Sequence, residues 1–213
     1  MTRLSSLMAI ALFVTAAPRD LWAAGDREVA RIVAFGGVCN RCELSGRKLV
    51  GARFLGADFS GSALVGSDLR AARFVGASFS GADFSRADLS GSAMVGADFQ
   101  AANLGHARLR GAMMSGGRFD GASFQSADLQ GAVMTGGVFN EADFSGAALH
   151  GAVIGGADLS RARGLTQTQF DTACGDTDTK APPKLKVRSC PGVRVIVRRV
   201  PAPLGPRNLV SGP

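Results

Sequence analysis

Large apolar residues recur at every fifth position from Leu44 to Leu159 without a break. The residue two positions before each of them is Ala, Ser or Gly, except at Cys42 and Arg47, and the residue two positions after is most often Gly. On an α-helix, residues five apart are rotated by about 140°, so the large residues would scatter around it. In an extended segment, the large residue and the small one two before it point the same way. The pattern therefore predicts short extended segments that pack inward in pairs and are separated by turns.

The identity of the large residue repeats every twenty positions, which defines four columns along the chain. This period predicts a four-sided helix with four pentapeptides in each turn, in which a Leu column faces a Phe column across a narrow core. A third column runs from Phe54 to Ile154 and changes from Phe to Met to Ile. The Leu column consists of Leu49, Leu69, Leu89, Leu109, Leu129 and Leu149, and the Phe column of Phe59, Phe79, Phe99, Phe119 and Phe139.

The repeated unit resembles that of the pentapeptide-repeat family, whose pattern is Ala-(Asp/Asn)-Leu-X-X. Ala57-Asp58-Phe59-Ser60-Gly61 is one example, and the resemblance covers residues 44–160. It implies an all-β fold, a right-handed quadrilateral parallel β-helix. The 24 pentapeptides of this solenoid would form about six coils. The family includes DNA mimics that protect gyrase with an acidic rod, but here residues 44–160 carry nine Lys and Arg against ten Asp and Glu. That function is therefore disfavoured.

The ends of the chain differ from the repeats. Residues 1–25 predict a signal peptide, because Arg3 precedes an apolar run and Ala23-Ala24-Gly25 offers a cleavage site, although an uncleaved anchor remains an alternative. We therefore expect an exported protein, periplasmic or secreted. Residues 26–43 are expected to cap the first coil, with Val29 to Ala34 lying over it. Residues 161–191 are expected to form a capping helix and a disulfide-tied segment, followed by a basic, Pro-rich tail at 192–213.

The capping helix is predicted between Leu165 and Cys174. Thr166 is a suitable N-cap with Gln169 three residues later, and Gly175 suits a C-terminal stop. Two residues of this helix, Phe170 and Ala173, would then face the last coil. The helix is expected to cover an edge that would otherwise pair with another molecule.

The four cysteines form two pairs in the sequence. Export permits a disulfide between Cys174 and Cys190, which would close a loop of about 16 residues. Cys39 and Cys42 fall on inward positions of the repeat phase, which favours a structural bridge or two buried thiols. A redox pair and half of a zinc site are the disfavoured alternatives, because no βαβ unit accompanies them and the other two cysteines lie at the far end of the rod.

The chain shows no arrangement of residues that predicts catalysis, a metal or a cofactor. His106 and His150 lie at outward positions about two coils apart, and no Gly-Lys-Ser/Thr follows the glycines. Acidic residues directly before the large residue are expected to accept local backbone hydrogen bonds. These are Asp58, Asp68, Asp83, Asp88, Asp98, Asp128, Asp143 and Asp158.

One side of the predicted helix has unusually apolar outward positions, and its corners are Gly throughout. These positions are Leu55, Val75, Val95, Met113, Val133 and Val153. A flat apolar stripe of this kind is typical of a docking surface, so we predict an unidentified protein partner or a homodimer there. The alternative is that apolar residues are merely tolerated on this strand face.

A second hypothesis concerns the basic end of the chain, where ten Lys and Arg stand against three Asp between Arg161 and Pro213. This segment could bind an anionic envelope surface, or it could simply be solvated. Nucleic-acid binding is disfavoured by export and by the scarcity of aromatic residues there. The basic residues concerned are Lys180, Lys184, Lys186, Arg188, Arg194, Arg198, Arg199 and Arg207.

Overall fold

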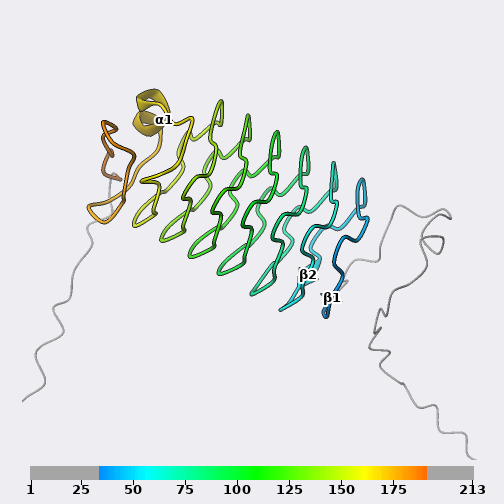
Figure 1. Cartoon of the computed structure of the whole chain (residues 1–213). Coiled ribbons are helices and arrows are strands. Elements are labelled where there is room, and N and C mark those ends of the chain that lie inside the picture. Colours follow the sequence, from blue (N-terminus) through cyan, green and yellow to red (C-terminus); the bar gives the residue numbers. More distant parts are fainter. Residues whose placement is uncertain (1–33, 191–213) are drawn as a thin grey trace, which may run out of the picture.

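In a computed structural model that describes residues 34–190, the chain forms a stack of coils joined by parallel β-bridges (Figure 1). Residues twenty apart pair in four ladders, as in Lys48 with Asp68 and Ala63 with Asp83. Backbone hydrogen bonds join the coils in both directions. Leu49 N donates to Asp68 O at 2.7 Å, and Asp68 N donates to Arg47 O at 2.9 Å. Four ladders with a twenty-residue register are the four-sided solenoid that the column pattern predicts.

The ladder begins before the first regular pentapeptide. Strand β1 (Ala34–Phe35) pairs in parallel with strand β2 (Arg53–Phe54), so Ala34 lies beside Arg53, nineteen residues away. The next bridge joins Val38 to Asp58 and restores the twenty-residue step. Residues 34–43 therefore belong to the solenoid, whereas the expected cap was bounded at 26–43. Residues 26–33, the signal peptide at 1–25 and the tail at 192–213 lie outside the described part of the chain.

Each side of the helix ends in a turn that contains a left-handed residue. Ala52 N donates to Leu49 O at 3.0 Å, and Gly51 between them has a φ of +70°. A positive φ at the third residue is what a type II turn requires, which explains the frequency of Gly at this position. Ala71 takes the same conformation with a φ of +56°, so the turn forms even at a residue whose side chain disfavours a positive φ.

The interior contains the large and small inward residues of every pentapeptide. All eleven members of the Leu and Phe columns are at most 3% exposed. Neighbouring rings of the Phe column stack along the rod with centroids 5.0 to 5.4 Å apart. This distance is close to the strand spacing of about 4.8 Å, so each coil contributes one ring to a continuous stack.

Helix α1 (Gln167–Thr172) follows the last regular pentapeptide and lies at one edge of the C-terminal end of the rod (Figure 1). Thr166 and Gln169 form a capping box, and Phe170 and Ala173 are buried. The expected stop at Gly175 is wrong, because Ala173 in extended conformation is already the C-cap. Gly175 instead packs closely, since a Cβ there would lie 2.7 Å from Val187 Cγ1.

The ladder also continues past residue 160. Val153 bridges Cys174, Asp158 bridges Lys180, and Gly175 bridges Ser189. The first of these steps is 21 residues long. The segment after α1 therefore forms part of a further coil instead of a separate appendage. Among the described residues, no helix is long and apolar enough to cross a membrane.

Candidate functional site

One side of the rod, here called the apolar side, consists of segments 53–55, 73–75, 93–95, 113–115, 133–135 and 153–155. Their first residues are joined in a single ladder from Arg53 through Met113 to Val153. The middle residue of each segment points inward and is at most 1% exposed. The flanking residues point outward, so the composition of this surface is set by the first and third position of each segment.

The six apolar residues predicted for docking all lie on the apolar side. Leu55, Val75, Val95 and Met113 are 45 to 49% exposed, and Val133 and Val153 are half-buried. They do not form one straight line. The first three follow the inward residue and the last three precede it, so the apolar strip crosses the side obliquely from one row to the other.

The apolar side differs from the other sides in its electrostatics. Ion pairs occur on the sides that carry Asp before the inward residue, as between Arg70 and Asp68 at 2.7 Å and Arg118 and Asp98 at 3.6 Å. Within residues 34–190, no such pair lies on the apolar side. Surface ion pairs of this kind contribute little to stability, at about 0 to 1 kcal/mol each. Their distribution nevertheless leaves one side without paired charge along most of its length.

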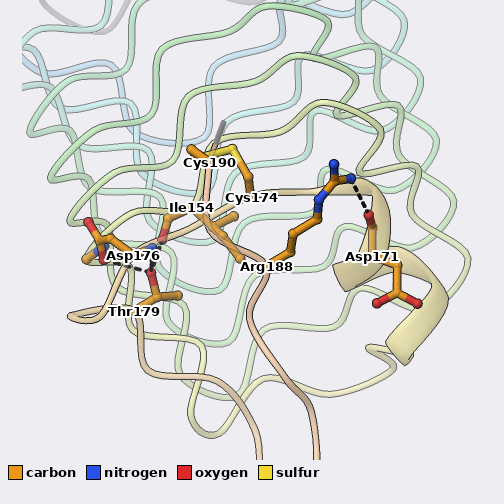
Figure 2. The surroundings of a disulfide bond; sticks show 8 residues. Ile154, Asp171, Cys174, Asp176, Thr179, Arg188 and Cys190 are labelled. Carbon is orange, nitrogen blue, oxygen red and sulfur yellow. Dashed lines mark hydrogen bonds between the residues drawn. A yellow bond between two sulfur atoms is a disulfide. The ribbon is translucent and has the colours of Figure 1, made fainter. Parts of the chain in front are cut away.

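A hollow lies at the C-terminal end of the apolar side, next to the disulfide shown in Figure 2. Gly155 and Gly175 are both buried there, and the carboxylate of Asp176 lies over Gly155. The hollow is lined by Thr135, Val153, Gly155, Gly175, Asp176, Thr177, Ser189 and Cys190.

The carboxylate of Asp176 is held in place by hydrogen bonds to one of its oxygens. Oδ1 accepts from Gly156 N at 2.8 Å and from Asp178 N at 3.0 Å. It also accepts from Thr179 Oγ1 at 3.0 Å (Figure 2). The bond from Gly156 is the main reason that the pKa of Asp176 lies below its ordinary value. Asp176 is therefore an ionised group of fixed orientation at the end of the apolar side.

Arg53 and Arg73 lie at the opposite end of the apolar side. Both are exposed, and they pair directly with each other in the ladder. Arg53, Arg73 and Asp176 also belong to this surface, although the sequence pattern did not indicate them. The arginines were passed over because they are not apolar. Asp176 was missed because the 21-residue step before Cys174 shifts it out of the repeat phase.

The remaining residues singled out from the sequence have structural surroundings. His106 and His150 are exposed, and all eight Asp residues accept the backbone N–H two residues later, as Asp58 does from Ser60 at 3.0 Å. The same contact is made by the other seven. Cys39 is bonded to Cys42, and Cys174 to Cys190. Among residues 34–190, no group of three or more His, Cys, Asp or Glu is placed to hold a metal ion.

These features define a solenoid with one apolar side, in which the Asp side chains accept backbone hydrogen bonds within the turns. A family model for pentapeptide repeats of 8 copies matches residues 39–74, 63–100 and 92–131, and another for 9 copies matches residues 119–163. Together the matches span more than half of the sequence. The chain belongs to the pentapeptide-repeat family.

Solved structures similar to this chain are of pentapeptide-repeat proteins. QnrB1, a plasmid-mediated fluoroquinolone resistance protein, is 21% identical over 74% of this chain and 87% of its own, with a TM-score of 0.41. A thylakoid-lumen protein from Arabidopsis thaliana is 29% identical over 65% and 84%, with a TM-score of 0.26. HetL from the cyanobacterium Nostoc, involved in heterocyst differentiation regulation, is 23% identical over 66% and 80%, with a TM-score of 0.22. Comparison with curated proteins gives no significant match.

Proposed function

We propose that this protein is a non-enzymatic, exported scaffold that docks another protein surface on its apolar side. The observation that carries this proposal is the presence of four apolar side chains in successive coils, each 45 to 49% exposed, on a side without ion pairs in the described residues. Removing such side chains from water on binding contributes roughly 25 cal/mol per Å² of apolar area. The Gly corners beside them, such as Gly76, keep the edge of this side low and allow a flat partner to approach.

Export is supported by two independent features of the chain. Residues 1–25 have the organisation of a signal peptide. The described residues contain two disulfides and no free cysteine, which is typical of an oxidising compartment. A role as a gyrase-protecting DNA mimic is not proposed, because the repeat body is close to neutral and export would separate the protein from gyrase.

The basic tail offers a second candidate function, binding to an anionic envelope surface. It rests on the excess of Lys and Arg after residue 160. Because residues 191–213 lie outside the described part, the apolar side is the better-supported site.

The experiment is to replace Val75, Val95, Met113 and Val133 together by Thr. We expect the variant to keep its circular dichroism spectrum and to lose both self-association in sedimentation and capture of partner protein from an envelope fraction. The control replaces three partly or well exposed valines on the other sides, Val50, Val65 and Val138, by Thr. Unchanged association of the first variant would overturn the proposed function.

A further inference from the structure

The two ends of the apolar side carry opposite charge. Arg53 and Arg73 lie at the N-terminal end, and neither forms an ion pair within residues 34–190. Asp176 lies at the C-terminal end, in the row that contains Leu55 and Val75. Between them the outward positions hold aliphatic, hydroxyl and small residues without charge. The side is therefore polarised along the rod.

The arginine pair is unfavourable in isolation. Arg53 and Arg73 are direct neighbours in the ladder, and like charges in that position destabilise paired strands. Asp68 and Asp88 are also like-charged ladder neighbours, but each of them has an arginine of this chain beside it, Arg70 at 2.7 Å and Arg108 at 3.9 Å, respectively. A carboxylate supplied by another molecule would reduce the repulsion between Arg53 and Arg73.

The hollow beside Asp176 has the chemistry to receive a guanidinium group. Because Oδ1 accepts three hydrogen bonds from the chain itself, Oδ2 is the oxygen left to accept from another group. Oδ2 lies above Gly155, where a Cβ would stand 2.7 Å from it. A side chain at position 155 would clash with this carboxylate, so Gly155 is what allows Asp176 to lie there. An arginine side chain entering the hollow would meet an oriented carboxylate, which is a favourable charge-assisted contact.

We propose that the occupant of the apolar side is a second copy of this chain, bound antiparallel about a two-fold axis near Met113. The proposal rests on the proposed function and names its partner. Along the ladder, Arg53 lies three coils before Met113, and Cys174, next to the coil position of Asp176, lies three coils after it. A two-fold axis across this side keeps each row opposite itself, so Met113 of one copy packs against Met113 of the other, and Arg53 lies opposite Cys174. The Arg53 side chain then extends across the side to the Asp176 carboxylate, two residues further along the chain.

The alternative orientation of two copies is disfavoured by the same charges. A parallel pair would place Arg53 and Arg73 of both copies together and the two Asp176 side chains together. The antiparallel pair uses the same patch on both copies and closes as a dimer without a free site for further growth. A standard interface buries about 800 Å² on each partner. Because one side of the rod offers a smaller area than this, we expect the dimer to dissociate on dilution.

The first test is sedimentation velocity on the full-length chain expressed with its own N-terminal segment. We expect a dimer at micromolar concentration, and at least a tenfold higher dissociation constant for Arg53→Glu/Arg73→Glu. Arg86→Glu/Arg108→Glu makes the same change of charge on other sides and is expected to dimerise as the wild type does. A wild-type chain that stays monomeric throughout the micromolar range would overturn the proposal.

The second test uses complementary charge reversal. Asp176→Lys alone is expected to be monomeric, yet a mixture with Arg53→Glu/Arg73→Glu should form a heterodimer, in which every end-to-end contact again joins opposite charges. Because Asp176 also organises its own turn, Asp176→Asn serves as the milder variant, which keeps an acceptor for Gly156 and should weaken the dimer. Failure of the mixture to associate, with both chains folded by circular dichroism, would overturn the antiparallel arrangement.

The third test fixes the orientation. All four natural cysteines are disulfide-bonded, so a Cys introduced on the apolar side is unique. Met113→Cys should crosslink to itself, whereas Leu55→Cys should not, because an antiparallel pair separates the two copies of residue 55 by several coils. Crosslinking of Leu55→Cys to itself would indicate a parallel pair, in which both copies of residue 55 lie at the same level. If the wild type is monomeric but the Thr variant loses a different captured protein, the second copy is excluded and the docking function stands.

Discussion

Each residue in the pentapeptide has a distinct task that follows from its side chain. The large residue fills the interior, and the residue two before it must be small because the interior is narrow. Gly117 and Gly137 show how narrow it is, since a Cβ at either position would come within 2.8 Å of the ring of Phe119 or Phe139. The Asp between the two inward residues accepts the backbone N–H that follows the large residue, as Asp143 does from Ser145 at 2.9 Å.

Enlarging a small inward residue should overpack the core. Ala97 and Ala127 are each 1% exposed. We expect Ala97→Leu or Ala127→Leu to lower the free energy of unfolding by about 1 to 3 kcal/mol, because the added methylene groups displace neighbouring rings and backbone. Thermal unfolding followed by circular dichroism measures this. Ala63→Leu, at an outward position, is the control, and an unchanged melting temperature for both inward variants would contradict the assignment.

At the scale of elements, the stability of the short strands depends on the strands of neighbouring coils, and the stability of α1 depends on the coil that it contacts. A six-residue helix has little stability of its own, so its contacts with the last full coil hold it. Gln169 joins the cap of the helix to this coil. Its Oε1 accepts from Thr166 N at 2.7 Å, and its Nε2 donates to Phe144 O at 3.0 Å and to Ala147 O at 2.9 Å.

Gln169→Ala should therefore destabilise the end of the rod more than Thr166→Ala does. Loss of an N-cap side chain costs about 1 kcal/mol. Loss of Gln169 removes the cap contact and two bonds to the coil, each contributing about 1 kcal/mol. Chemical denaturation compares the variants, and hydrogen exchange at residues 144–152 locates the effect. Equal losses for the two variants would show that Gln169 acts only as part of the cap.

The whole molecule is a stack in which each coil is stabilised mainly by its neighbours, so its stability sums many similar contributions. Carboxylates are a repeated part of that sum. The pKa of Asp58, Asp143 and Asp158 lies below the ordinary value of 3.8, mainly because side chains of Ser60, Gln125 and Ser160, respectively, donate to the ionised form. The pKa of Asp68 is lowered chiefly by its hydrogen bond from Arg70.

These shifts predict that the rod loses stability in acid. A carboxyl group whose folded pKa is depressed stabilises the fold above its unfolded pKa of about 4, and this contribution is lost as the pH falls through the folded pKa. Urea unfolding at pH 7 and at pH 3 should show a lower midpoint at pH 3. In Asp58→Asn/Asp158→Asn, which keeps acceptors but removes two titrating groups, the difference between the two midpoints should be smaller. A midpoint independent of pH would contradict the prediction.

Much of this architecture could be predicted from the sequence because it is periodic. The unbroken spacing from Leu44 to Leu159 fixes which residues face inward, and the twenty-residue columns fix the number of sides. The Asp contacts are local, within two residues, and so are also readable from the sequence. The apolar side could be recognised for the same reason, since all its aliphatic members lie within the regular phase.

Where the twenty-residue spacing is interrupted, only the tertiary structure decides which residues pair. The nineteen-residue step at β1 and the 21-residue step before Cys174 are set by pairing with the neighbouring coil, about twenty residues away in the sequence, which no local pattern specifies. These steps place Asp176 at the end of the apolar side and open the hollow beside it. The sequence by itself thus determined the repeated body of the rod and its apolar side. The charge at the far end of that side, on which the proposed antiparallel dimer depends, was decided by nonlocal hydrogen bonds.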